Sequence, residues 1–140
     1  MTLHKFSNAK VLLSVADDLH IKVDLINGKE AKDYIDFVLE KYKPWKLEGH
    51  LSISDDVERL DTEENEFTFS LIMKDEPAYI FFEQNHINKN AVIIVENAKS
   101  ISLLMKNSHG MEYFVSNKDT TYLVAVNWYS IEFKGDISLY

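Results

Sequence analysis

The first half of the chain has the hydrophobic spacing of two amphipathic helices around one short strand. Apolar residues recur every three or four positions from Asn8 to Leu19, which is the spacing of one helix face. Residues 21–25 alternate apolar and charged side chains, which predicts a half-buried strand before the turn signal Asn27-Gly28. A second helix is predicted over residues 29–43, because the helical period returns with acidic residues early, basic residues late and a proline just beyond.

The second half alternates apolar and polar positions as strands do. Residues 66–73 alternate in this way, and a turn at 75–77 leads to the apolar stretch 78–83, so a β-hairpin is predicted there. A short helix is predicted over 97–107, and further strands over 91–95, 112–116, 121–127 and 129–133, the last three as a meander with Trp128 in a strand. Strands that follow two helices favour a single α+β domain over 1–140, with a mainly antiparallel sheet and two or three helices packed on it.

The composition fits one globular domain in a reducing compartment. The 140 residues are 46% apolar, which is enough for a core, and the absence of cysteine excludes disulfides, thiolate zinc sites and cysteine nucleophiles. The longest apolar runs of the second half are about five residues, far below the roughly 18 that a membrane span needs. Lys5 and Lys10 precede only a short apolar run before Asp17, so we expect no signal peptide and a cytoplasmic protein.

Acidic residues are concentrated in one segment. Between Leu47 and Glu83 the chain has eleven acidic residues, opposed only by Arg59 and Lys74, a formal charge of −9 within a chain of net charge −8. Seven carboxylates fall within twelve residues: Asp55, Asp56, Glu58, Asp61, Glu63, Glu64 and Glu66. A field of this sign attracts cationic partners and repels nucleic acid and anionic lipid. The alternative is a solvated loop, in which Ser54–Asn65 joins two strands with one helical turn capped by Ser54.

The chain contains no enzyme motif and no cofactor motif. Its four glycines are isolated, and no nucleophile elbow is present. No two of the five histidines stand four positions apart, so we predict no catalytic residue, no cofactor and no structural transition-metal site. Residues 61–66 place oxygen side chains at every second position like the start of a calcium loop, but Glu66 stands where the loop needs glycine. Weak divalent binding is the most that this segment predicts.

Two tryptophans are candidate anchors for a protein partner. Trp45 follows the second helix and Trp128 stands near the C-terminus, and an exposed aromatic residue supplies the desolvated centre that charge cannot. Other aromatic residues are expected in the core or in cross-strand pairs: Tyr113, Phe114, Tyr122 and Tyr129. No basic cluster accompanies these residues, which argues against nucleic-acid binding.

The C-terminal third of the chain resembles small bacterial α+β proteins. Residues 112–119 (EYFVSNKD) and 122–128 (YLVAVNW) are similar to the tail of small uncharacterised proteins of this type, some of which are immunity proteins of toxin systems. The resemblance consists of hairpin patterning and a few aromatic residues. It implies a bacterial, non-enzymatic protein, and no binding residue is carried over from it.

These observations favour a binding protein. The leading hypothesis is a small acidic module, such as an immunity protein that occludes a basic toxin domain, in which the seven carboxylates supply charge and Trp45 or Trp128 the anchor. One alternative is an enzyme whose site assembles from distant acid/base groups: His50, His86, His109, Glu83 and Asp75. Another is a structural subunit that self-associates through an edge strand at 91–95 or 122–126.

Overall fold

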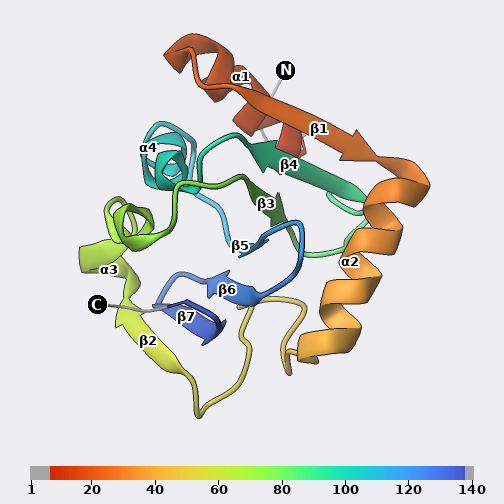
Figure 1. Cartoon of the computed structure of the whole chain (residues 1–140), viewed down its shortest axis with the longest axis vertical. Coiled ribbons are helices and arrows are strands. Elements are labelled where there is room, and N and C mark those ends of the chain that lie inside the picture. Colours follow the sequence, from red (N-terminus) through yellow and green to blue (C-terminus); the bar gives the residue numbers. More distant parts are fainter. Residues whose placement is uncertain (1–6, 138–140) are drawn as a thin grey trace.

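A seven-stranded antiparallel sheet forms the centre of the molecule (Figure 1). The computed structural model describes residues 7–137, so the expectation about a signal peptide, which rests partly on Lys5, lies outside the described residues. The strands are β1 (Val23–Asn27), β2 (Glu58–Asp61), β3 (Ala78–Phe81), β4 (Ala91–Val95), β5 (Tyr113–Ser116), β6 (Tyr122–Val126) and β7 (Ser130–Gly135). Their order in the sheet is β1-β4-β3-β5-β6-β7-β2. The α+β fold with an antiparallel sheet and a C-terminal meander is therefore confirmed.

Two longer helices and several single turns cover the sheet. The helices are α1 (Asn8–Leu19), α2 (Gly28–Tyr42), α3 (Thr62–Asn65) and α4 (Ile101–Lys106), with 3-10 turns η2 (Phe69–Ile72) and η3 (Ala98–Ser100). The first predicted helix is confirmed residue for residue, and the second is shifted by one position. Ser7 begins α1, because its hydroxyl accepts a hydrogen bond from the Lys10 amide at 3.2 Å.

Both faces of the sheet are buried, which explains why β5 and β6 are buried at every position. Successive strand residues point to opposite faces, so each face has its own core. One core combines Leu12 of α1 and Leu104 of α4 with sheet residues such as Ile93. The other combines Ile35 of α2 with Phe114, and full burial of a side chain such as Ile35 contributes about 1.5–3 kcal/mol. The prediction that the second helix packs across the sheet is confirmed.

Residues 66–73 do not form the predicted hairpin strand. They form a turn and η2, which buries Phe69 and Ser70. The backbone N–H groups of Ser70 and Ser102 each donate to the hydroxyl of the other residue, at 3.1 and 3.0 Å. The prediction is wrong because this partner stands 32 residues away, where local alternation cannot reveal it.

The two segments suspected as edge strands lie inside the sheet. The first, β4, lies between β1 and β3, and the second, β6, lies between β5 and β7. Neither has a free edge, so self-association through 91–95 or 122–126 is ruled out in this fold. The edges of the sheet are β1 and β2.

Candidate protein-binding surface

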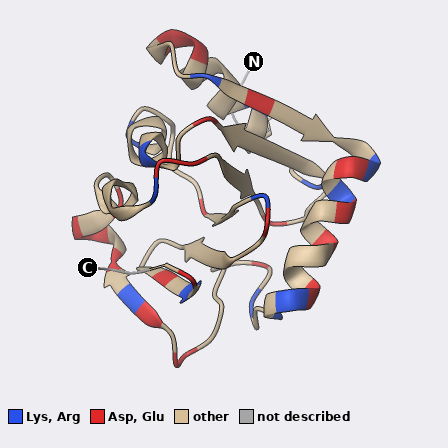
Figure 2. Ribbon diagram, in the orientation of Figure 1, with Lys and Arg blue, Asp and Glu red and all other residues tan. Residues whose placement is uncertain are grey.

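The acidic segment forms one edge of the sheet. Asp55 and Asp56 precede β2, Glu58 and Asp61 belong to it, and Glu63 and Glu64 follow on α3. All six are exposed, whereas Glu66 is half-buried. Figure 2 shows these acidic residues gathered on β2 and α3, at the lower left of the view, whereas α2 carries charges of both signs.

The expectation of a single loop with a helical turn capped by Ser54 is wrong. The segment contains β2 itself, and Asp61 caps α3, because its carboxylate accepts the Glu63 amide at 3.1 Å. Residues 61–66 therefore do not have the conformation of a calcium-binding loop, because Asp61 ends β2 and Thr62–Asn65 form α3. Strand β2 pairs with β7, and Leu60 packs against the core while its neighbours are charged. A charged edge strand of this kind resists pairing with another strand of the same charge, such as a second copy of β2.

Two carboxyl groups of the segment have shifted pKa values. The Ser54 hydroxyl donates a hydrogen bond to Asp56, which lowers the pKa of that carboxyl. Burial raises the pKa of Glu66, because its charge is partly removed from water. The six exposed carboxylates therefore supply the negative charge of this edge. Glu66, which is half-buried, contributes less to it.

The turn between β6 and β7 displays two exposed aromatic residues. Trp128 is 50% exposed and Tyr129 is 71% exposed. They form a two-residue turn because the side-chain oxygen of Asn127 accepts the amides of Tyr129 and Ser130, at 2.8 and 2.9 Å. The strand expected at Trp128 and the core or cross-strand position expected at Tyr129 are thus wrong. Burial is confirmed for the other three aromatic residues: Tyr113, Phe114 and Tyr122.

This turn is fastened to the acidic edge by Thr62. The Thr62 amide donates to the Tyr129 carbonyl at 3.2 Å, and its hydroxyl donates to the Asn127 carbonyl at 2.9 Å. Glu63 and Glu64 follow directly on the chain. Carboxylates and exposed aromatic rings are therefore held side by side by two hydrogen bonds, although more than 60 residues separate them in sequence.

On its other side the turn contacts His50. The Glu112 carboxylate accepts the Trp128 amide at 3.1 Å and is 2.8 Å from Nδ1 of His50. The His50 ring meets the Tyr129 ring edge to face, with 4.9 Å between centroids. We call the set Asp61, Glu63, Glu64, Trp128, Tyr129 and His50 the acidic–aromatic surface. Tyr129 was not among the predicted binding residues. The signal that could have found it is Asn127 between two apolar runs, because asparagine often begins a turn.

Trp45 lies in a different place. It is 54% exposed, and its indole N–H donates to the Ser52 hydroxyl at 2.7 Å. Ser52 in turn donates to the buried carboxylate of Glu132 on β7, at 2.8 Å. Trp45 is thus held over the α2 face of the sheet and is not joined to the turn that carries Trp128.

Polar sheet residues fix the chain segment that carries Trp45 and His50. Glu132 accepts the Ile53 amide at 2.7 Å, Asn127 donates to the Leu51 carbonyl at 2.8 Å, and Glu112 accepts the Leu51 amide at 3.1 Å. Leu51 and Ile53 themselves are buried in the second core. These three hydrogen bonds and the burial of Leu51 and Ile53 hold the exposed residues of this segment in place.

The acid/base groups proposed for an enzyme do not converge. Glu83 accepts the Gly49 amide at 2.8 Å and His50 pairs with Glu112, so these groups hold loops together. The Asp75 carboxylate instead accepts a hydrogen bond from the side-chain amide of Asn97, at 3.0 Å. The hollow beside Glu83, Glu112 and Trp128 has a volume of about 260 Å³. His86 and His109 are exposed, and neither lines this hollow.

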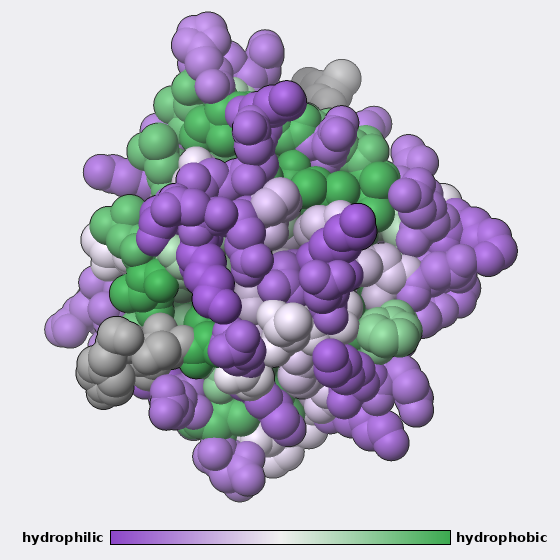
Figure 3. Space-filling view, viewed as in Figure 1, coloured by the Kyte–Doolittle hydropathy of each residue, from purple (hydrophilic) through white to green (hydrophobic). Residues whose placement is uncertain are grey.

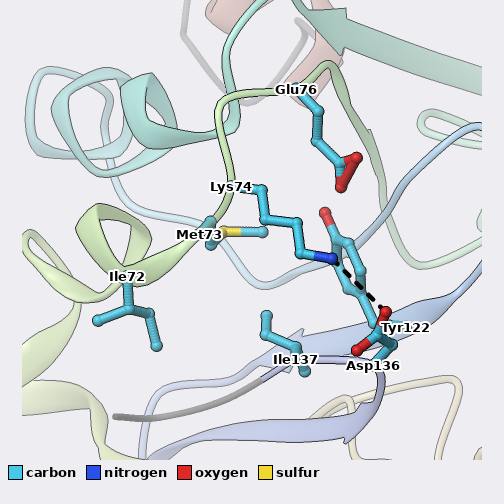
Figure 4. Close-up of a pocket in the computed structure, with 7 residues that line it drawn as sticks. All are labelled: Ile72, Met73, Lys74, Glu76, Tyr122, Asp136 and Ile137. Carbon is cyan, nitrogen blue, oxygen red and sulfur yellow. Dashed lines mark ion pairs between the residues drawn. The ribbon is translucent and has the colours of Figure 1, made fainter.

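A second hollow, drawn in Figure 4, has a volume of about 160 Å³. Lys74 reaches toward Asp136, with 3.5 Å between Nζ and Oδ2, and the Glu76 carboxylate points toward Tyr122. Burial, and then the charge of Glu76, raise the pKa of Tyr122, so its hydroxyl stays protonated at neutral pH. This hollow offers an exposed ion pair and a neutral phenol, which is not the arrangement of an activated nucleophile and its base.

Exposed apolar side chains lie next to α3. Phe67, Leu71 and Ile72, at and before η2, are 49%, 62% and 41% exposed. Figure 3 shows apolar residues gathered over η2, at the left of this face. The strand predicted over residues 66–73 gave no reason to expect these three side chains together on the surface.

The comparisons add no relative. No family model, no curated protein and no solved structure matches the chain. The resemblance of residues 112–119 and 122–128 to small uncharacterised bacterial α+β proteins, some of them immunity proteins, therefore stays a prediction. Among residues 7–137, no group of three or more histidine, aspartate or glutamate side chains is arranged to hold a metal ion. Nor does this described part contain a helix that is both long and apolar enough to cross a membrane.

Proposed function

We propose that this protein is a small acidic protein-binding module whose partner is a cationic protein domain, as in an immunity protein that occludes a basic toxin domain such as a nuclease. Carboxylates on a rigid sheet edge mimic phosphate groups, steer the encounter and block a cationic cleft. The resemblance of residues 112–119 and 122–128 to small bacterial α+β proteins, some of which are immunity proteins, agrees with this function.

One observation carries the proposal: Thr62 joins the carboxylate-bearing helix α3 to the turn with Trp128 and Tyr129. Long-range charge speeds association, but affinity comes from a desolvated centre, for which tryptophan and tyrosine are the most frequent residues. The acidic–aromatic surface has both parts. The turn and α3 are fixed by hydrogen bonds before any partner arrives, which lowers the entropy cost of binding.

The test pairs this protein with a cationic toxin domain, which is sought first in the open reading frames next to its own. The domain is expressed in a bacterial host with and without this protein, and growth and the dissociation constant of the purified pair are measured. We expect the wild-type protein to restore growth. Trp128→Ala should weaken binding by a factor of about 10 or more, as truncation of an anchor does.

Matched controls separate the surface from general effects. Trp45→Ala removes an equally exposed tryptophan outside the surface, and we expect it to change affinity less than about threefold. Asp17→Asn with Asp18→Asn neutralises an adjacent exposed pair on α1, as Glu63→Gln with Glu64→Gln does on α3. If wild-type protein leaves growth arrested, or if both tryptophan variants bind alike, the proposal is wrong.

A further inference from the structure

The free edge of β2 has unpaired backbone groups whose positions follow from the strand register. In an antiparallel ladder, successive residues alternate between hydrogen-bonding to one neighbour and pointing away from it. The Thr62 amide donates to Tyr129 beside β7, and the register continues with Leu60 opposite Ile131 and Glu58 opposite Phe133. Arg59 and Asp61 therefore point their backbone groups away from β7.

Part of this edge is already satisfied. The side-chain amide of Asn65 donates to the Asp61 carbonyl at 2.9 Å, which closes the end of β2 next to α3. Within residues 7–137, the Arg59 N–H, the Arg59 carbonyl and the Asp61 N–H have no such partner. These three groups offer the ladder of hydrogen bonds that an added strand requires.

Charge decides which strand fits this edge. Asp55 and Asp56 stand before β2, and Glu63 and Glu64 stand after it. The four residues of β2 extend over about 10 Å, so an added strand has carboxylates near both of its ends. A second copy of this chain would place like charges opposite one another, which destabilises a sheet, whereas lysine or arginine side chains would be paired.

The other edge of the sheet, β1, lacks the negative charge that would favour a cationic strand. Strand β1 also has one free edge, but there Asp24 is offset by Lys22 next to the strand. Of the two edges formed by residues 7–137, the β2 edge is the one that combines unpaired backbone groups with a strong excess of negative charge, because six exposed carboxylates there are opposed by Arg59. The free backbone groups favour a strand as the occupant, and the surrounding charge favours a cationic one.

We propose that β2 accepts an extended, lysine- or arginine-rich segment of the partner as an eighth strand of the sheet. This inference rests on the proposed function and states how the acidic edge is used. Backbone hydrogen bonds at Arg59 and Asp61 hold the segment, and the flanking carboxylates select its charge. The turn with Trp128 and Tyr129 lies at the α3 end of the same edge, where it contacts the body of the partner.

The experiment uses a fluorescent ten-residue peptide of alternating lysine and threonine as the probe. Its binding is measured by anisotropy for wild type, Arg59→Pro and Arg59→Thr. Both variants lose the arginine charge and its hydrogen bond to the Ser54 carbonyl, but only proline removes the outward N–H. Proline is tolerated at an edge position whose N–H faces solvent, and circular dichroism checks that both variants keep the fold.

We expect Arg59→Pro to weaken peptide binding at least tenfold and Arg59→Thr to change it less than threefold. A second measurement is amide hydrogen exchange: on adding the peptide, the Arg59 and Asp61 amides should slow at least tenfold, while the Leu60 amide, which already faces β7, should stay within twofold. Equal affinities for the two variants, or unchanged exchange at Arg59 and Asp61, would overturn the added-strand inference.

The same data separate this inference from the proposed function. If Arg59→Pro binds the toxin domain as Arg59→Thr does while Trp128→Ala still weakens it, the binding surface stands and the added strand is wrong. If sedimentation shows that wild type alone forms a dimer that Arg59→Pro abolishes, the occupant is a second copy, and the cationic strand is wrong.

Discussion

Glu132 is a charged residue buried inside the sheet, and its partners explain why it is tolerated there. It is 3% exposed, and it accepts the Ser52 hydroxyl and the Ile53 amide. Glu132→Ala would leave both donors buried without an acceptor, so we expect unfolding free energy to fall by about 2–4 kcal/mol. Glu58→Ala, at an exposed position on the neighbouring strand β2, should change it by less than about 0.5 kcal/mol. Urea unfolding measures both, and similar losses would contradict the assigned role of Glu132.

Glu66 should weaken the fold as it ionises. Burial raises its pKa above the ordinary value of 4.5, so the folded state holds this proton more tightly than the unfolded state. Its contribution to stability is present below pH 4.5 and is lost as pH rises through the folded pKa. Glu66→Gln should therefore gain stability relative to wild type between pH 4 and pH 7. Glu63→Gln, at an exposed position, is the control, and parallel pH curves for wild type and Glu66→Gln would contradict the prediction.

Single residues show why the site was only partly visible in the sequence. The acidic residues could be named, because charge clustering is a property of the sequence. The sequence alone could not reveal that Thr62 pairs with Tyr129 or Glu112 with His50, because these contacts join residues far apart in the chain. For the same reason, the sequence alone could not show that Trp128 lies beside the acidic edge and that Trp45 does not.

Helix α1 offers a test of local backbone strain. It ends at His20, whose φ of 58° lies in the left-handed region that glycine occupies without a steric penalty. His20→Gly should raise unfolding free energy by about 0.5–1 kcal/mol. The same replacement at the exposed, helical Ser14 should lower it by a similar amount, because glycine costs about 0.5–1 kcal/mol within a helix. Thermal unfolding measures both, and two losses would show that His20 has compensating contacts.

Elements that depend on local signals were predictable from the sequence. Helices α1 and α2 have sustained apolar periodicity and end signals, and both were placed within one residue. Strand β2 was missed because an edge strand with three charged residues out of four lacks alternation. Local alternation wrongly predicts a strand at residues 69–72. Their true conformation depends on a contact with Ser102, which is distant in the sequence. Tertiary contacts decided both cases, and propensity was only a weak guide.

At the scale of the whole molecule, the net charge of −8 is less informative than its placement. The sheet edge at β2 and α3 carries acidic residues from one stretch of chain, while α2 pairs its charges internally, as in Lys29 with Asp33 at 2.6 Å. A molecule with this asymmetry presents one face to a cation at a distance. The fold thus turns a charge cluster in the sequence into an oriented field beside exposed aromatic rings.

This orientation leads to a prediction about association rates. The neutralised variant replaces Asp55 and Asp56 by Asn and Glu63 and Glu64 by Gln. Its unfolding free energy should stay within about 0.5 kcal/mol of wild type or rise slightly, because crowded like charges repel. Stability cannot distinguish a solvated edge from a binding edge, so the association rate with the proposed cationic partner must be measured. For wild type it should fall as salt shortens the Debye length from about 10 Å to about 3 Å, because steering acts over that distance. The neutralised variant should associate slowly at low salt and respond weakly to salt. A wild-type rate that is independent of salt, or equal to that of the variant, would show that these carboxylates only keep the edge solvated.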